Sequence, residues 1–353
     1  MSREERMAIL QMVQEGKITA EDGVNLIKAV ETAEQRELEA ANPSLAAPAA
    51  EGGDQPTPVV TDGKGLIREG GVLNDDVISR LASELLGLFG PGRRVEEDIE
   101  GEFAADGPVT IEFSTTNGRI DIKPWDGPGF KLHLIKTVRA GSDKQAEEAA
   151  RDLAVIDNVP GLLSVRMREG FHFNTGLAIE ALLPRDRVSD LRLRTSNGRV
   201  EVVDIDCATC NISTSNGRIV AEGVSARSAN LKTSNGSITA SGMTGSVDAG
   251  SSNGSITLTL AGTEGDIKMH TSNGSIRCYV PQDNAAGFDI EARTMLGSIT
   301  ADVPNLEIIN QEKSFGHNYL RARTADLASR QRQVRVTATT SNGSIGIVPG
   351  RQG

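Results

Sequence analysis

A short repeat constrains this chain more than any other feature of its sequence. The motif Thr-Ser-Asn-Gly or a near copy recurs from Asn197 onward at spacings of 18 to 20 residues, and an earlier copy contains Asn117. Its asparagines are Asn117, Asn197, Asn216, Asn235, Asn253, Asn273 and Asn342. A degenerate copy ends in Leu296-Gly297, 23 residues after Asn273 and 46 before Asn342. A fixed period near 20 residues is typical of a solenoid, and the spacing of 46 is compatible with one skipped or decorated unit.

Aligning the copies on their asparagine predicts two strands in each repeat. The position three residues after the asparagine is always Ile or Val. This core column consists of Ile120, Val200, Ile219, Ile238, Ile256, Ile276, Ile299 and Ile345. Positions six and four before the asparagine, and five after it, are also apolar or small, with Arg, Glu, Lys, Asp, Asn, Ser and Thr between them. Alternation of this kind indicates strands with one face buried and the other exposed, joined at Asn-Gly.

Two mostly-β architectures fit this alternation. If Asn-Gly closes a type I′ turn, the repeats form an antiparallel β meander; if it is only a corner, about eight rungs stack in parallel as a single-stranded β-solenoid. Both need a sharp bend, and Asn and Gly tolerate the positive φ angles that we expect there. Position −2 is Thr or Ser in every copy. Only the solenoid puts like residues about 4.8 Å apart, where hydroxyl and Asn ladders can form, so we favour it.

Two segments interrupt the repeat. The 80 residues between Asn117 and Asn197 predict strands over Phe130–Val138, Leu162–Met167 and Leu177–Leu183, with a helix over Lys144–Leu153. We expect this segment to be an irregular N-terminal part of the same sheet, covered by one helix. Residues 307–333 are a second predicted insertion.

The N-terminal quarter of the chain is organised differently. Apolar residues at helical spacing predict a helical hairpin over residues 1–36, and residues 37–71 are rich in Ala, Pro, Gly and acidic residues without a period, as in a disordered linker. Residues 72–92 predict an amphipathic helix that caps the β-repeat domain at 93–350. Because two short helices bury little surface, we expect residues 1–36 to bind a protein partner or to self-associate.

These motifs resemble a known family. The Thr-Ser-Asn-Gly-Ser-Ile repeats, preceded by the hairpin segment Glu15–Asp22, look like the bacterial putative-adhesin family of β-strand-repeat proteins, with an N-terminus similar to a short helical oligomerisation module of the SHOCT type. The resemblance covers about residues 3–31 and 95–349. It implies a β-repeat fold, with a role in cell-envelope stress for some members, and it implies no catalytic residues.

Charge and composition exclude several classes of protein. The formal net charge is −11, which disfavours nucleic acid and anionic lipid as partners, and no apolar run is long enough to span a membrane. The first residues lack the apolar stretch of a signal peptide, so a cytoplasmic or peripheral envelope location is expected and the compartment itself stays open. With 8 Phe, 2 Tyr and 1 Trp, the core must be built from aliphatic and small residues.

The sequence predicts no catalytic residue, metal site or cofactor. Cys207 and Cys210 have the spacing of half a zinc or redox site, but Cys210 and Cys278 fall in inward columns and are expected to be buried structural residues, which leaves the role of Cys207 open. The outward acids, such as Asp121 and Glu201, are expected on distant rungs. Glycan hydrolysis needs paired carboxylates.

We therefore predict a non-enzymatic scaffold or binding protein that presents an extended β surface, with a carbohydrate-active β-helix enzyme as the alternative. A glycan or another envelope component could bind this surface. The outward strip of Thr239, Ser241, Thr257 and Thr259 is compatible with carbohydrate binding and also with a solvated sheet face.

Overall fold

The computed structural model describes residue 27 and residues 93–139, 143–168, 175–283 and 286–350. The predicted hairpin (1–36), linker (37–71) and capping helix (72–92) lie outside these residues, apart from Ile27, which is helical. The chain divides into two compact units, of which the second, Arg94–Val138 with Glu147–Gly353, contains nearly all the described residues and is here called the β-domain.

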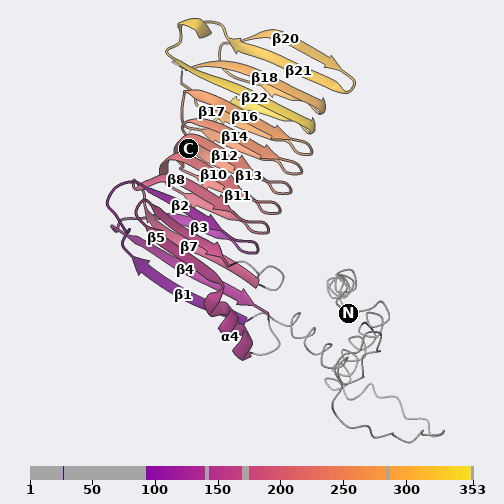
Figure 1. The fold of residues 1–353 in the computed structure, drawn as a ribbon. Helices are drawn as coiled ribbons and strands as arrows, with labels where there is room; N and C mark the ends of the chain where they lie inside the picture. Colours follow the sequence, from indigo (N-terminus) through magenta and orange to yellow (C-terminus); the bar gives the residue numbers. More distant parts are fainter. Residues whose placement is uncertain (1–26, 28–92, 140–142, 169–174, 284–285, 351–353) are drawn as a thin grey trace, which may run out of the picture. The chain divides into compact units, whose positions relative to one another are not determined.

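The protein is mostly β, with two mixed sheets that face each other across the core (Figure 1). The first sheet has 11 strands in the order β1 (Arg93–Gly101), β4 (Phe130–Val138), β7 (Thr175–Pro184), β3 (Ile120–Trp125), β9 (Val200–Val203), β11 (Ile219–Glu222), β13 (Ile238–Met243), β15 (Ile256–Leu260), β17 (Ile276–Val280), β23 (Ile345–Pro349) and β19 (Ile299–Ala301).

The second sheet has 12 strands in the order β20 (Leu306–Ser314), β21 (His317–Thr324), β18 (Ala286–Leu296), β22 (Arg332–Asn342), β16 (Gly265–Thr271), β14 (Ser246–Ser251), β12 (Ser225–Lys232), β10 (Asp206–Ser213), β8 (Val188–Arg194), β2 (Val109–Ser114), β6 (Leu162–Met167) and β5 (Ala154–Val159). Helix α4 (Asp143–Asp152) and the 3₁₀ turn η2 (Leu327–Ser329) complete the described elements. No helix among the described residues is long and apolar enough to cross a membrane.

Equivalent strands of successive repeats pair in parallel. In the first sheet Ile219 pairs with Ile238, and Ile238 with Ile256; in the second sheet Ile212 pairs with Leu231. The two strands of one repeat, such as β10 and β11, lie in different sheets. The antiparallel meander is therefore wrong for the repeats. Antiparallel pairs occur outside them, between β4 and β7, β5 and β6, β18 and β21, and β20 and β21.

The last two repeats do not stack in chain order. Strands β22 and β23, which belong to the Asn342 repeat, pair with β16 and β17 on one side. On their other side they pair with β18 and β19, which belong to the degenerate Leu296 repeat. The spacing of 46 residues reflects a decorated unit, because the hairpin β20–β21 lies between the Leu296 and Asn342 copies. The chain first builds the terminal rung and then returns to fill the place beneath it.

The first insertion adds strands to both sheets, and the second adds strands to the second sheet. The predicted strands and helix of the first correspond to β4, β6, β7 and α4, with β5 in addition; β4 and β7 join the first sheet, while β5 and β6 join the second. The second insertion contains the hairpin β20–β21, which pairs with β18 and forms the end of the second sheet.

Candidate functional site

The structure joins the asparagines of the repeat in a continuous amide ladder along the exposed corner. Each side-chain Nδ2 donates to the Oδ1 of the asparagine on the rung before it, at 2.7–2.9 Å. The donors are Asn197, Asn216, Asn235, Asn253, Asn273 and Asn342. At the first rung Asn117 donates instead to the backbone carbonyl of Thr175, at 3.1 Å. Because all these amides face one another, the ladder connects rungs and offers little for a ligand.

The Thr and Ser hydroxyls do not form the ladder that the sequence suggested. They are buried, and all except Thr115 donate to the glycine carbonyl of a neighbouring rung, as Thr233 Oγ1 does to Gly217 at 2.9 Å and Thr271 Oγ1 to Gly254 at 2.8 Å. A carbonyl is the nearer acceptor because the corner backbones stack directly on each other. The hydroxyl of Thr115, on the first rung, is buried and has no hydrogen-bond partner among the described residues.

The corner glycines are needed for a reason that the sequence did not predict. None of those that follow the asparagines has a positive φ; among the repeat corners only Gly297 does. A Cβ on Gly198, Gly217 or Gly236 would instead lie 1.7–1.8 Å from the carbonyl oxygen of the glycine beneath it. Close backbone approach, rather than a left-handed turn, excludes side chains there.

The core column lies between the two sheets. Seven of its eight residues are at most 1% exposed, namely Ile120, Val200, Ile219, Ile238, Ile256, Ile276 and Ile345. Ile299 is half-buried, because β19 is the last strand of its sheet.

The cysteines lie among these structural residues. Cys210 and Cys278 are buried, and Cys207 is half-buried. Burial raises the pKa of the Cys278 thiol to about 12, and a hydrogen bond with Cys207, together with burial, raises the pKa of Cys210. In the part of the chain that the structure describes, no group of three or more His, Cys, Asp or Glu residues is placed to hold a metal.

An open pocket of about 860 Å³ lies on the outer face of the first sheet, over β1, β4, β7 and β3 and beside Arg199. Its lining residues are Asp98, Ile99, Glu100, Arg119, Asp121, Lys123, Lys131, Leu132, His133, Glu180, Ala181, Leu182 and Arg199. Four of these are acidic and four are Arg or Lys, so the pocket combines apolar surface with charged groups of both signs.

Ion pairs organise the centre of this pocket. Strand pairing brings Asp121 next to Glu180 on one side and next to Glu201 on the other. Arg119 bonds Asp121, at 2.8 Å between Nε and Oδ2, and also Glu180. Arg199 bonds Glu201 and lies 3.5 Å from the other oxygen of Asp121. We call these five residues the arginine–carboxylate cluster.

The cluster corrects one expectation from the sequence. Asp121 and Glu201 were expected on distant rungs, yet they lie on the neighbouring strands β3 and β9, because the chain between them leaves the stack and returns. The sequence did carry a signal, since Arg119, Arg199 and Arg218 share the second position after the asparagine, where later copies have Ser. Glu180 had no such signal, because it lies in the insertion.

The outer wall of the pocket is formed by β1 and β4. His133 Nδ1 lies 2.6 Å from Asp98 Oδ1, and Lys131 Nζ lies 2.6 Å from Glu100 Oε1. Lys131 Nζ also lies 4.7 Å from the centre of the Trp125 ring. Like the cluster, this wall pairs each acid with a base.

The arrangement favours binding over acid–base catalysis. Asp121, Glu180 and Glu201 each accept from an arginine, whereas a glycosidase needs one carboxyl group that carries its own proton. The hydrogen bond from Arg119 to Glu180 raises the pKa of that guanidinium, so Arg119 stays charged. The lining thus presents fixed donors and acceptors together with apolar surface from Ile99 and Leu182.

Comparison with known proteins gives two family matches. Residues 156–347, more than half of the chain, match the family described as Toastrack DUF4097. Residues 4–35 match a SHOCT-like domain. No curated protein matches the chain.

Several solved structures are similar to this chain at low identity. One is a putative cell adhesion protein from Clostridium sporogenes, at 12% identity over 73% of this chain and 100% of that chain, with a TM-score of 0.36. A putative adhesin from Bacteroides fragilis has 13% identity over 72% and 97% of the two chains and a TM-score of 0.37. A putative adhesin from Parabacteroides distasonis has 11% identity over 73% and 98% and a TM-score of 0.39.

Proposed function

Because this chain belongs to the Toastrack DUF4097 family, we propose that its β-domain is a non-enzymatic β-solenoid scaffold that binds an uncharged glycan in the pocket beside Arg119 and Arg199. One observation carries the proposal: each of the four acidic side chains that line the pocket is already paired with an Arg, Lys or His. A polyanion would meet as many carboxylates as cations there. A molecule with many hydroxyl groups can both donate to the carboxylates and accept from the arginines.

The size and lining of the pocket support a sugar more than a small metabolite. A volume of about 860 Å³ lies in the upper part of the usual range for ligand sites. Ile99 and Leu182, which are half-buried, supply apolar surface for the carbon faces of a sugar ring. We propose that the ligand is a glycan of the cell surface or envelope. A link to envelope stress is part of the same proposal.

The proposal also assigns a binding role to residues 1–36. We propose that this segment, of which residues 4–35 match a SHOCT-like domain, binds a protein partner or a second copy. Residues 37–71 would serve as linker and 72–92 as a capping helix for the domain at 93–350. The scaffold would then join a glycan at the pocket to a protein at the N-terminus.

Titration of the full chain with neutral and anionic soluble glycans tests the pocket. We expect calorimetry to detect a neutral oligosaccharide that binds the wild type, and Arg199→Ala to weaken binding by about tenfold or more, because a charged hydrogen-bond donor is lost. The matched control is Arg218→Ala. Arg218 occupies the same repeat position one strand further on, is exposed and does not line the pocket.

Three results would contradict this function. Equal affinity of the wild type and Arg199→Ala for the glycan would show that the glycan binds outside the pocket. Tighter binding of anionic than of neutral glycans would contradict the charge argument. Release of reducing ends by the wild type, abolished in Glu180→Gln, would establish the carbohydrate-active enzyme instead.

A further inference from the structure

The outer face of the second sheet carries a regular line of basic side chains. Strand pairing aligns one residue from each of the successive strands β6, β2, β8, β10, β12, β14, β16, β22 and β18. In this order the residues are Arg166, Ser114, Arg194, Ser213, Lys232, Gly250, His270, Thr339 and Arg293. A basic residue thus occupies every second strand, and a small one occupies each strand between. We call this line the basic row.

The small residues leave space beside the basic ones. Arg194 is exposed, while the stem of the half-buried Lys232 lies across Gly250, where an added Cβ would be 3.0 Å from Lys232 Cδ. A hollow of about 300 Å³ is lined by Arg194, Ser213 and Lys232 together with residues of the neighbouring strands. A ligand can therefore approach the cations from the outer face of the sheet.

The charge on this face differs in sign from that of the whole chain. The basic row contains no acid. The row beside it, two residues earlier on each strand, carries these charged residues: Glu112, Arg192, Asp248, Lys268 and Glu291. Together the two rows have six Arg or Lys residues and three acids, although the formal net charge of the chain is −11. Because salt screens charges beyond about 10 Å, a ligand on the row would respond to this local excess.

The spacing of the row matches one conformation of an acidic chain. Neighbouring strands are about 4.8 Å apart, so basic residues on every second strand repeat at about 9.6 Å. In a polyproline II helix every third residue lies on the same face, and three residues rise about 9.3 Å. Same-face residues of an extended β-strand repeat at about 6.6 Å, which does not match.

We propose that the basic row binds an acidic peptide in the polyproline II conformation, with Glu or Asp at every third residue, which runs along the stack and across the strands. Each carboxylate would meet one basic side chain, and the residues between would lie over the small positions. Arg194 is the best available cation, because it has no ion pair among the described residues, whereas Lys232 Nζ lies 2.6 Å from Asp248. The proposal is independent of the glycan pocket, which lies on the first sheet.

Synthetic peptides test the spacing with the full chain. Fluorescence anisotropy at low ionic strength should show that a peptide of five Pro-Pro-Glu repeats binds about tenfold more tightly than a peptide of the same composition with its five Glu residues contiguous. The uncharged peptide of five Pro-Pro-Gln repeats should not bind measurably. Added salt should weaken the binding of the Pro-Pro-Glu peptide, since exposed ion pairs are screened.

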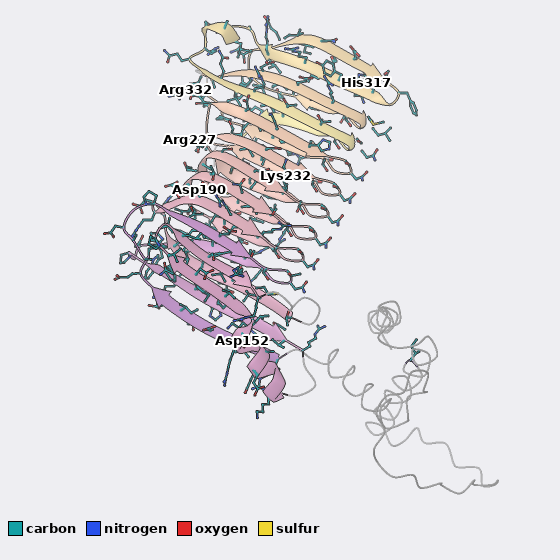
Figure 2. All side chains as sticks on the ribbon, viewed as in Figure 1. Asp152, Asp190, Arg227, Lys232, His317 and Arg332 are labelled. Atoms are coloured by element: carbon teal, nitrogen blue, oxygen red, sulfur yellow. The ribbon has the colours of Figure 1, made fainter. Side chains whose placement is uncertain are left out.

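Charge reversal tests the site. Arg194→Glu should weaken binding of the Pro-Pro-Glu peptide by about fivefold or more, because an attraction is lost and a repulsion takes its place. The matched control is Arg227→Glu, which changes the net charge equally. Arg227 is also exposed and without an ion pair among the described residues, but it lies toward the opposite end of β12 from Lys232 (Figure 2).

Three results would overturn the proposal. Equal affinity for the regular and the contiguous Glu peptides would remove the spacing argument. Equal weakening by Arg194→Glu and Arg227→Glu would show that the peptide binds outside the row. Binding of a linear uronic-acid oligosaccharide that is lost in Arg194→Glu, without binding of the peptide, would make the row a site for an acidic glycan. That result would remain distinct from binding at the glycan pocket, which Arg199→Ala tests.

Discussion

At the scale of single residues, the corner glycines set how closely the rungs can stack. Each corner brings a glycine carbonyl within hydrogen-bond reach of the Thr or Ser hydroxyl of a neighbouring rung, as Thr233 shows with Gly217. A side chain on the glycine would occupy the same space as that carbonyl. The recurring Asn-Gly pair thus combines an amide that links rungs with a residue that lets the backbones approach closely.

Gly236→Ala should be strongly destabilising. The added Cβ would lie 1.7 Å from the Gly217 carbonyl oxygen, so the two rungs would have to separate and lose their hydrogen bonds. We expect a loss of about 3 kcal/mol or more in the free energy of unfolding, measured by urea denaturation. The matched control is Gly346→Ala, where a Cβ would have no atom within 4 Å, and equal effects at the two sites would contradict the close-packing argument.

Cys278 should make the β-domain less stable at alkaline pH. Burial raises its pKa from 9.0 to about 12, so above pH 9 the unfolded thiol loses its proton while the folded one keeps it. The unfolded state then binds fewer protons, and stability falls by about 1.4 kcal/mol per pH unit between pH 9 and 12 from this group. The stabilising effect is complete below pH 9.

The variant Cys278→Ala measures this contribution. Urea denaturation at pH 7, 9 and 10 should show a shallower alkaline loss in the variant than in the wild type. Alanine already occupies the equivalent inward position in other copies, at Ala221 and Ala240, so the fold should tolerate it. Parallel pH profiles for the two proteins would show that Cys278 does not titrate with folding.

At the scale of elements, the strands were predictable and their final order was not. Alternation of apolar and polar residues places the repeat strands, because one face must be buried wherever two sheets enclose a core. The order of the last two rungs depends on which of the two strands, β18 or β22, pairs with β16. Both orders would bury the same columns of apolar residues, so the sequence does not distinguish between them. The absence of asparagine at Leu296 is compatible with a terminal rung, where the ladder has no further amide to meet.

Strand β22 should control the stability of the whole C-terminal end. Val336→Asp would bury an unpaired charge between β16 and β18 at a cost of several kcal/mol, about 2–7 for a polar group alone. Hydrogen exchange should therefore rise together in β18, β20, β21 and β22, although β18 precedes β22 in the chain. The control Thr337→Asp, on the outer face of the same strand, should leave exchange unchanged. Continued protection of β18 in Val336→Asp would contradict the inserted order.

At the scale of the whole molecule, the repeat determined the fold class and the insertion determined the pocket. The columns predict strands with one buried and one exposed face, and the composition predicts a core with few aromatic residues. Glu180, Lys131 and His133 come from the segment between the first two repeats, whose strands carry no period that could place them beside Arg119. A candidate site built where a repeat is interrupted is invisible to an analysis of the repeat alone.

The rung-to-rung hydrogen bonds have a consequence for the length of the protein. The amides and hydroxyls of the middle corners, such as Asn216, Asn235 and Thr233, bond to an adjacent rung, so a middle repeat is held there by its two neighbours. Gain or loss of one such unit leaves both the arginine–carboxylate cluster and strand β20 intact, and moves them apart or together by about 4.8 Å. The distance between the cluster and β20 can therefore change in fixed steps, without any change in the residues at either end of the β-domain.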